Sequence, residues 1–346
     1  MTAVSLVKLT RDKEFWLEDG NIVLIARDVG FRIYRGLLVA QSTVFADMFG
    51  SPNSTADEYY DDCPVVRLSD SPEDLRYFLR VLIPSAHRMY VWPNMDCIES
   101  LSKRLRRFYR NDEALPVTLD EISAVIRLSH KYHVADAQRQ ALSTLKLYFT
   151  DSFDDFESFG EDGLFHMKWA DAIGAVNLAR LTDTRSILPT AFYQCCELGD
   201  GVIDGCQRPD GHVEHLGFED RRICMAGRIA LVREARALVF RIFQETPSHR
   251  CLSRRICRSA LHAMLVRAAV EKAPVEPAVL RPWTTFIDEQ ADRLKLCGRC
   301  RRMLWARELD VRKEIWARLP GIFGMYILGW GMDDGETTSE SGSSVG

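Results

Sequence analysis

Short apolar runs separated by polar turns occupy the N-terminal part of the chain. Ile22 to Ile25 form an apolar, mostly β-branched run, and after a polar break the stretch from Phe31 to Tyr34 alternates apolar and polar side chains. Alternation with a period of two is typical of a half-buried strand, and two such runs around a short turn indicate a hairpin. The sequence therefore predicts a pair of strands between Ile22 and Tyr34.

Helix and strand signals follow this hairpin. Ser42 has the side chain of an N-cap and precedes a short apolar helix, and Cys63–Leu68 has the pattern of a third strand. The sequence from Ser71 to Asp74 combines a capping serine, a proline at the first helical position and an acid at the third, which is the start signal of a helix. Its apolar residues recur at helical spacing and predict a buried face, formed by Leu75, Phe78, Leu79 and Leu82.

Helices are predicted for most of the remaining chain. Thr118 and Glu121 offer a second capping box, and the apolar positions that follow predict a helix pair ending near Phe149. Further on, Leu231, Ala235, Leu238 and Ile242 mark one face of a long helix from about 219 to 243. The predicted fold class is α+β: a small sheet covered by short helices, followed by an all-α C-terminal domain.

Residues 19–50, with the sequence DGNIVLIARDVGFRIYRGLLVAQSTVFADMFG, resemble the opening of a BTB/POZ domain. CPVVRLSDSPEDLRYFLRVLI looks like its continuation in the BTB proteins of mushroom-forming fungi, and the helix pair from Val117 to Phe149 resembles their closing helices. Two family histidines are replaced, by Tyr34 and by Gln41. The signature positions are Asp19, Phe31, Ile33, Tyr34, Arg35, Leu38, Ala40, Ser42, Phe45, Met48 and Phe49.

This resemblance implies a non-enzymatic protein–protein interaction module that forms homodimers and recruits protein partners, as an adaptor does. In one branch of the family the partner is a cullin-type ubiquitin ligase, and that branch often carries a hydrophobic-x-Glu element before the third strand. This chain has Ala56-Asp57-Glu58 there, which departs from the element. The expected organisation is an arm at 1–14, a BTB/POZ-like domain at 15–155 with an insertion at about 84–117, and a helical domain at 160–331. The run at 332–346 contains almost nothing to bury and is expected to be a disordered tail.

Charge is distributed unevenly along the chain. The 346 residues carry a formal net charge of −4, but residues 221–330 contain 22 Lys and Arg against 10 Asp and Glu, a net charge of +12. The rest of the chain has 23 against 39, or −16. A second basic stretch, from Lys103 to Arg110, lies in the insertion, where a solvated helix face is the expected structure. The basic C-terminal half supports an alternative function, a zinc-stabilised regulator that binds nucleic acid or chromatin.

The ten cysteines bear on both cellular location and chemistry. Lys8, Arg11 and Lys13 stand where a secretory signal would need apolar residues, and no run approaches the roughly eighteen apolar residues of a membrane span. We therefore expect an intracellular protein, cytoplasmic or nuclear, with no membrane partner and with cysteines that are reduced or bind metal.

Four of these cysteines form the candidate metal site. Cys251-x5-Cys257 and, some forty residues later, Cys297-x2-Cys300 offer thiolates in two pairs, which can close a tetrahedral zinc site. The alternatives are four separate buried thiols, or a redox pair at Cys297 and Cys300. His249 and His262 are alternative ligands.

No motif nominates a catalytic residue, and the chain is not expected to be an enzyme. Ser344 matches G-x-S-x-G but lies in a polar tail without the strand and helix that this motif needs. Gly329 to Gly335 miss the dinucleotide-binding spacing by one residue. His130 and His133 share a predicted helix face but have no third ligand beside them in the sequence.

Overall fold

The computed structural model describes residues 9–50, 58–83, 117–158, 165–166, 168–271 and 277–331. They form two compact units that interleave along the chain. Unit 1 comprises Met1–Tyr148, Phe159–Thr182 and Cys206–Glu214, and unit 2 comprises Phe149–Ser158, Asp183–Gly205 and His215–Gly346. The predicted single boundary between 155 and 160 does not describe this division, because two later segments belong to unit 1.

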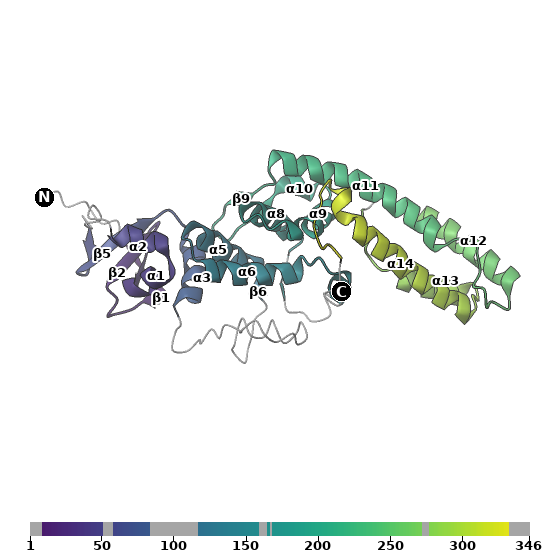
Figure 1. The fold of residues 1–346 in the computed structure, drawn as a ribbon, viewed down its shortest axis with the longest axis horizontal. Helices are drawn as coiled ribbons and strands as arrows, with labels where there is room; N and C mark the ends of the chain where they lie inside the picture. The colour runs from purple at the N-terminus through teal and green to yellow at the C-terminus, as the bar shows by residue number, and fades with distance from the viewer. Residues whose placement is uncertain are drawn as a thin grey trace, which may run out of the picture. The chain divides into compact units, whose positions relative to one another are not determined.

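Unit 1 contains strands and short helices, and Figure 1 shows their order. The strands are β1 (Thr10–Trp16), β2 (Ile22–Ala26), β3 (Val29–Ile33), β4 (Tyr59–Tyr60), β5 (Cys63–Leu68), β6 (Val117–Thr118), β7 (Phe165–His166), β8 (Cys206–Gln207) and β9 (Val213–Glu214). The helices are α1 (Arg35–Gln41), α2 (Thr43–Gly50), α3 (Pro72–Leu82), α5 (Leu119–Lys131), α6 (Ala135–Tyr148) and α8 (Asp171–Leu181).

A five-stranded mixed sheet with the order β1-β3-β2-β5-β4 forms the base of unit 1. The predicted hairpin is confirmed: β2 and β3 pair antiparallel around the turn at Arg27, whose φ is 53°. The predicted third strand is β5, which pairs parallel to β2. Every residue of β2 is buried, because this central strand is covered on both of its faces. On one face Val23 and Ile25 pack with Cys63 and Val65 under Leu9, Trp16 and Tyr60.

The predicted helix starts are also confirmed. The Ser71 hydroxyl accepts a hydrogen bond from the backbone N–H of Asp74 at 3.1 Å, and Thr118 caps α5 through the N–H of Glu121 at 3.4 Å. The predicted face of α3 is buried, with Leu75, Phe78 and Leu79 fully covered. The fold class is therefore α+β, as the pattern predicts.

Some observed features differ from the predictions. β1 begins at Thr10, inside the segment predicted as an arm, because it adds to the sheet beside β3. The basic helix predicted in the insertion, most of the Ala56-Asp57-Glu58 element, Ser344 and the tail at 332–346 lie outside the described residues.

The β8–β9 hairpin belongs to unit 1 although it lies far along the chain. Arg208 contacts the carboxylates of Asp74 and Asp210, and its Nε lies 3.5 Å from Glu214. Glu214 in turn pairs with Arg127 of α5 at 2.5 Å. Each of these side chains is at least three-quarters buried. Together they form a connected network in which every buried charge contacts an oppositely charged group.

Unit 2 consists of helices. They are α7 (Phe153–Ser158), the 3-10 helix η1 (Arg185–Ile187), α9 (Leu188–Glu197), α10 (Gly201–Asp204), α11 (Phe218–Ile242), α12 (Arg254–Glu271), α13 (Thr284–Arg293) and α14 (Gly298–Ile322). The long helix predicted from about 219 to 243 is α11, and its predicted face is buried. Figure 1 shows α11 beside α14, against which it packs. Within the described residues, no helix combines the length and apolar character that crossing a membrane requires.

Candidate metal centre

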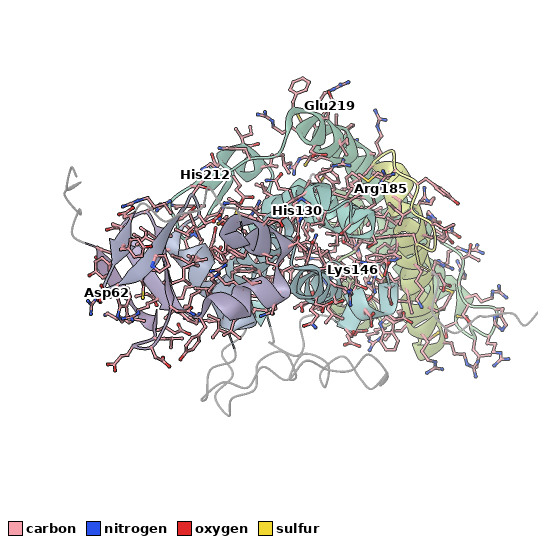
Figure 2. The ribbon with its side chains drawn as sticks, turned by 60° about the vertical axis from the view of Figure 1, so that its left-hand side comes forward. Asp62, His130, Lys146, Arg185, His212 and Glu219 are labelled. Atoms are coloured by element: carbon pink, nitrogen blue, oxygen red, sulfur yellow. The ribbon has the colours of Figure 1, made fainter. Side chains whose placement is uncertain are left out.

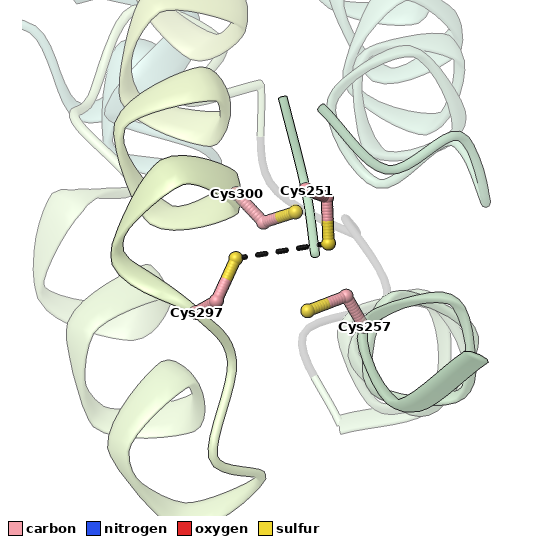
Figure 3. Close-up of side chains that lie close together, drawn as sticks. All are labelled: Cys251, Cys257, Cys297 and Cys300. Atoms are coloured by element: carbon pink, nitrogen blue, oxygen red, sulfur yellow. Dashed lines mark hydrogen bonds between the residues drawn. The ribbon is translucent and has the colours of Figure 1, made fainter. Parts of the chain in front are cut away.

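Four cysteines from three segments of unit 2 meet between α12 and α14 (Figure 3). Cys251 lies in the loop between α11 and α12, and Cys257 lies in the first turns of α12. Cys297 is the N-cap of α14, and Cys300 lies in its first turn. The two pairs predicted from the sequence therefore converge, and their side chains point toward one another (Figure 3).

Local backbone geometry places these sulfurs. The carbonyl of Cys297 accepts hydrogen bonds from the N–H groups of Cys300 and Arg301, each at 3.0 Å, which begins α14 and turns both thiols to one side. In the same way, the N–H of Cys257 donates to the carbonyl of Ser253 at the start of α12. Two helix N-termini thus face the cluster, and their positive dipole ends stabilise negative charge on the sulfurs, an effect that burial opposes.

The spacing of the sulfurs suits a tetrahedral ion. All four Sγ atoms lie within 4.8 Å of one another, and the Sγ atoms of Cys297 and Cys251 are 3.8 Å apart. In a tetrahedral site with Zn–S bonds near 2.3 Å, neighbouring sulfurs are about 3.8 Å apart. Four thiolates also complete the coordination shell and leave no open position for substrate, which is typical of a structural site.

The environment of the cluster is mostly buried and shifts the thiol pKa values. Cys257 and Cys300 are fully buried, Cys251 is 6% exposed and Cys297 is half-buried. Burial raises the pKa of Cys257 and of Cys300, although the N–H of Ser248 donates to the Cys300 sulfur at 3.4 Å and opposes that rise. Burial also acts to raise the pKa of Cys297, but the Cys300 N–H and the neighbouring thiols outweigh it and lower that pKa to about 7.

The alternative ligands are not part of the cluster, which contains cysteines alone. His262 contacts Glu245, with Nδ1 and Oε1 2.6 Å apart, and both side chains are exposed. The redox alternative concerns Cys297 and Cys300 alone, and the structure adds Cys251, whose Sγ lies 3.8 Å from that of Cys297. The alternative of four separate thiols is contradicted by the geometry, because the sulfurs converge.

His130 and His133, which share a predicted helix face, are not part of a metal-ligand cluster in the described residues. His130, which is labelled in Figure 2, lies on α5 and is exposed. Its Nδ1 lies 3.5 Å from Nε2 of Gln138. His133, also exposed, has a φ of 54° in the turn that follows α5. Among the described residues, the four cysteines are the one group of three or more candidate ligands that comes close enough to hold a metal.

Some of the apolar residues singled out in the N-terminal sequence lie in the core of unit 1 and others do not. Phe31, Ile33, Leu38 and Phe45 are fully buried. Phe45 stacks on Tyr132, the C-cap of α5, with ring centroids 4.4 Å apart. Met48 and Phe49 are half-buried, and Ala40 is exposed.

The polar signature residues join neighbouring elements. The Ser42 hydroxyl donates to the carbonyl of Tyr132 at 2.6 Å and accepts from the N–H of Phe45 at 3.0 Å, so it caps α2 and ties that helix to α5. The Tyr34 hydroxyl donates to Asp19 at 2.5 Å. The Arg35 guanidinium donates to the carbonyl of Phe49 at 2.9 Å.

Gln41 also joins two elements. Its amide donates to the carbonyls of Leu37 and Leu82, at 3.1 and 3.0 Å, and so connects α1 with the end of α3.

The contact between the Cys206 thiol and the Asp171 carboxylate is one feature that no sequence motif indicates. Cys206 is buried in β8 with its Sγ 3.6 Å from Oδ1 of Asp171, and burial together with that carboxylate raises its pKa to about 12. Burial likewise raises the pKa of Asp171. These two residues are 35 positions apart, so no local motif connects them.

The chain matches no family model, no curated protein and no solved structure.

Proposed function

We propose that unit 1 is a protein–protein interaction module of the BTB/POZ type, which forms homodimers and recruits protein partners without catalysing a reaction. The observation that supports it is the position of the signature residues within the element order. The hairpin β2–β3, the helix pair α1–α2, the parallel strand β5, the capped helix α3 and the pair α5–α6 follow one another as the resemblance implies. The fully buried Phe31, Leu38 and Phe45 lie in this framework at their signature places.

Sedimentation velocity on the full chain at micromolar concentration tests the dimer. We expect the mass of two chains, because family members commonly associate through this domain. A single species with the mass of one chain would contradict homodimerisation. Recruitment of a different partner would then have to be tested separately, by recovering proteins bound to the immobilised chain.

A cullin-type partner is a narrower proposal, and one contact bears against it. Glu58, the acid of the candidate cullin element, pairs with Arg67 of β5 through two hydrogen bonds of 2.6 and 2.9 Å. A partner would have to compete with Arg67 for this carboxylate. If the full chain recovers no cullin in a pull-down, and Arg67→Ala does not restore recovery, the cullin proposal fails.

For unit 2 we propose that the four cysteines bind one zinc ion that stabilises the helical domain. The four-thiol donor set, the burial of three of its members and the closed coordination shell support this assignment. Elemental analysis of the purified chain should find about one zinc per chain.

Replacement of ligands tests the zinc proposal further. Cys257→Ser and Cys300→Ser should each reduce zinc content to a small fraction of the wild-type value, because a hydroxyl binds zinc far more weakly than a thiolate. Cys63→Ser is the matched control: Cys63 is a buried thiol of unit 1 whose Sγ donates to the carbonyl of Gly20, a bond that serine can also make. Zinc-free wild-type protein, or equal zinc in all variants, would contradict the proposal.

A further inference from the structure

Basic side chains surround the four-cysteine cluster. The segments 247–258 and 293–302, which supply all four cysteines, contain nine Lys and Arg and no Asp or Glu. A zinc ion with four thiolates carries a net charge of about −2, so nine cations are many more than this centre needs for neutrality. The excess requires another explanation.

The arginines of unit 2 fall into two groups by their contacts. Many are paired within the fold: Arg318, for instance, binds Glu234 through two hydrogen bonds of 2.9 Å, and Arg301 pairs with Asp292. Apart from Arg301, the cations of the two cysteine segments are exposed and lack an acidic partner among the described residues. They are Arg250, Arg254, Arg255, Arg258, Arg293, Lys295, Arg299 and Arg302, and we call them the basic rim.

The cysteine cluster holds the rim in place. Arg254, Arg255 and Arg258 lie in the first turns of α12, and Arg299 and Arg302 lie in the first turns of α14. Arg299 also donates to the backbone carbonyl of Arg250 at 2.5 Å, which links the loop to α14. Cations brought together from separate segments repel one another, so their collection at one end of the unit costs free energy unless an anion binds there.

We propose that the basic rim binds the phosphate backbone of duplex nucleic acid. Arginine guanidinium groups suit phosphate oxygens because they donate in a planar fork, and a row of phosphates matches cations spread over several elements. The two segments contain no Phe, Tyr or Trp, so the stacking platforms that single strands prefer are missing from them, which favours a duplex. This inference goes beyond the proposed function, because it concerns unit 2 and does not depend on dimerisation or partner binding by unit 1.

The test is the affinity of the full zinc-loaded chain for a fluorescent 20-base-pair DNA duplex, measured by anisotropy over a range of salt concentrations. We expect log affinity to fall linearly with log salt, by about 0.9 for each phosphate contact. The rim variant Arg254→Gln, Arg255→Gln, Arg258→Gln should bind about tenfold more weakly or worse at moderate salt, with a salt slope reduced by two to three.

The matched control is Arg221→Gln, Arg233→Gln, Arg236→Gln on α11. These arginines are also exposed and lack an acidic partner among the described residues, but they lie outside the cysteine segments. The control makes the same change in net charge and should keep most of the affinity. A second rim variant, Arg293→Gln, Lys295→Gln, Arg302→Gln, should behave like the first, and unchanged zinc content confirms that each variant is folded.

Three outcomes would overturn the inference. One is the absence of duplex binding at low salt, and another is an equal loss of affinity in the rim variants and the α11 control. The third is rim-dependent binding to vesicles containing anionic lipid but not to DNA, because Leu252 and Ile256, which are 87% and 59% exposed beside the rim, could enter a bilayer surface. Loss of binding confined to the rim variants supports the inference.

Discussion

At the scale of single residues, the same ion-pair chemistry has different consequences in buried and exposed positions of unit 2. Arg312 and Glu308 are 3% and 1% exposed, and two hydrogen bonds of 2.5 and 3.2 Å join them. Arg312 also contacts Glu157 and the carbonyl of Leu280, and Glu308 accepts from the N–H of Trp283. This pair therefore connects α14 with α7 and with the segment before α13, where an unpaired charge would have no water to stabilise it.

Arg312→Met should lower the free energy of unfolding by about 3–5 kcal/mol, because it leaves the carboxylate of Glu308 buried without its partner. The matched variant Arg318→Met breaks a pair with Glu234 in which the arginine is 51% exposed, and it should cost about 1 kcal/mol or less. Urea unfolding of both variants measures the difference. Equal losses would show that burial does not govern the contribution of these pairs.

Cys206 should make stability depend on pH in alkaline solution. Its pKa is raised to about 12 in the folded chain from an ordinary value of 9.0, so the folded state keeps this proton where the unfolded chain loses it. This contribution is complete below pH 9 and is lost as pH rises toward 12.

We expect wild-type protein to lose about 2 kcal/mol more than Cys206→Ala between pH 8 and pH 11. Urea unfolding under reducing conditions at several pH values measures the two slopes. Because the comparison uses slopes, a general loss of stability caused by the cavity in the variant does not affect it. Parallel slopes would mean that Cys206 titrates alike in both states.

At the scale of elements, capping side chains define where the helices of unit 1 begin. Ser71 is 6% exposed and lies 3.1 Å from the N–H that it satisfies, whereas Thr118 makes a longer contact of 3.4 Å. Both caps were predictable from sequence, because an N-cap and its N–H partner lie within one turn. The start of β1 was not predictable in this way, because this strand is stabilised by pairing with β3, some twenty residues away.

Ser71→Ala should lower the free energy of unfolding by about 1 kcal/mol, and Thr118→Ala should lower it by less. The control is Ser259→Ala on the exposed side of α12, with an expected change of about 0.5 kcal/mol or less. Denaturant unfolding measures all three variants. A loss for Ser259→Ala as large as that for Ser71→Ala would contradict a specific role for the cap.

At the scale of the whole molecule, the two units should respond differently to metal removal, because all four cysteines of the cluster belong to unit 2. A strong zinc chelator should speed amide hydrogen exchange about tenfold or more around Cys251–Cys257 and in the first turns of α14, since metal binding there contributes to folding. Exchange in the β2–β3 hairpin should not change.

Hydrogen exchange measured by mass spectrometry, with and without chelator, tests this expectation. Cys300→Ser provides the control, because its exchange should already be fast and should not respond to the chelator. Equal acceleration in both units would show that they do not unfold independently of each other.

The sequence by itself determined the features that depend on neighbouring residues. The hairpin, the capped helices, the buried faces of α3 and α11 and the α+β class follow from periodicity and capping, which act within a turn or between adjacent strands. The spacing of the two cysteine pairs likewise predicted the candidate metal ligands, because four thiolates in two pairs can close a tetrahedral zinc site.

Only the tertiary structure decided the features that need distant segments to meet. Convergence of Cys251 and Cys257 with Cys297 and Cys300 requires the start of α12 and the start of α14 to come together in space. The β8–β9 hairpin likewise belongs to unit 1, where Arg208 pairs with Asp74. Packing also decided which arginines are paired, as Arg312 is, and which are exposed, as Arg254 is. The amino-acid composition does not distinguish paired arginines from exposed ones, because whether an ion pair forms depends on distance in space and not on distance along the chain.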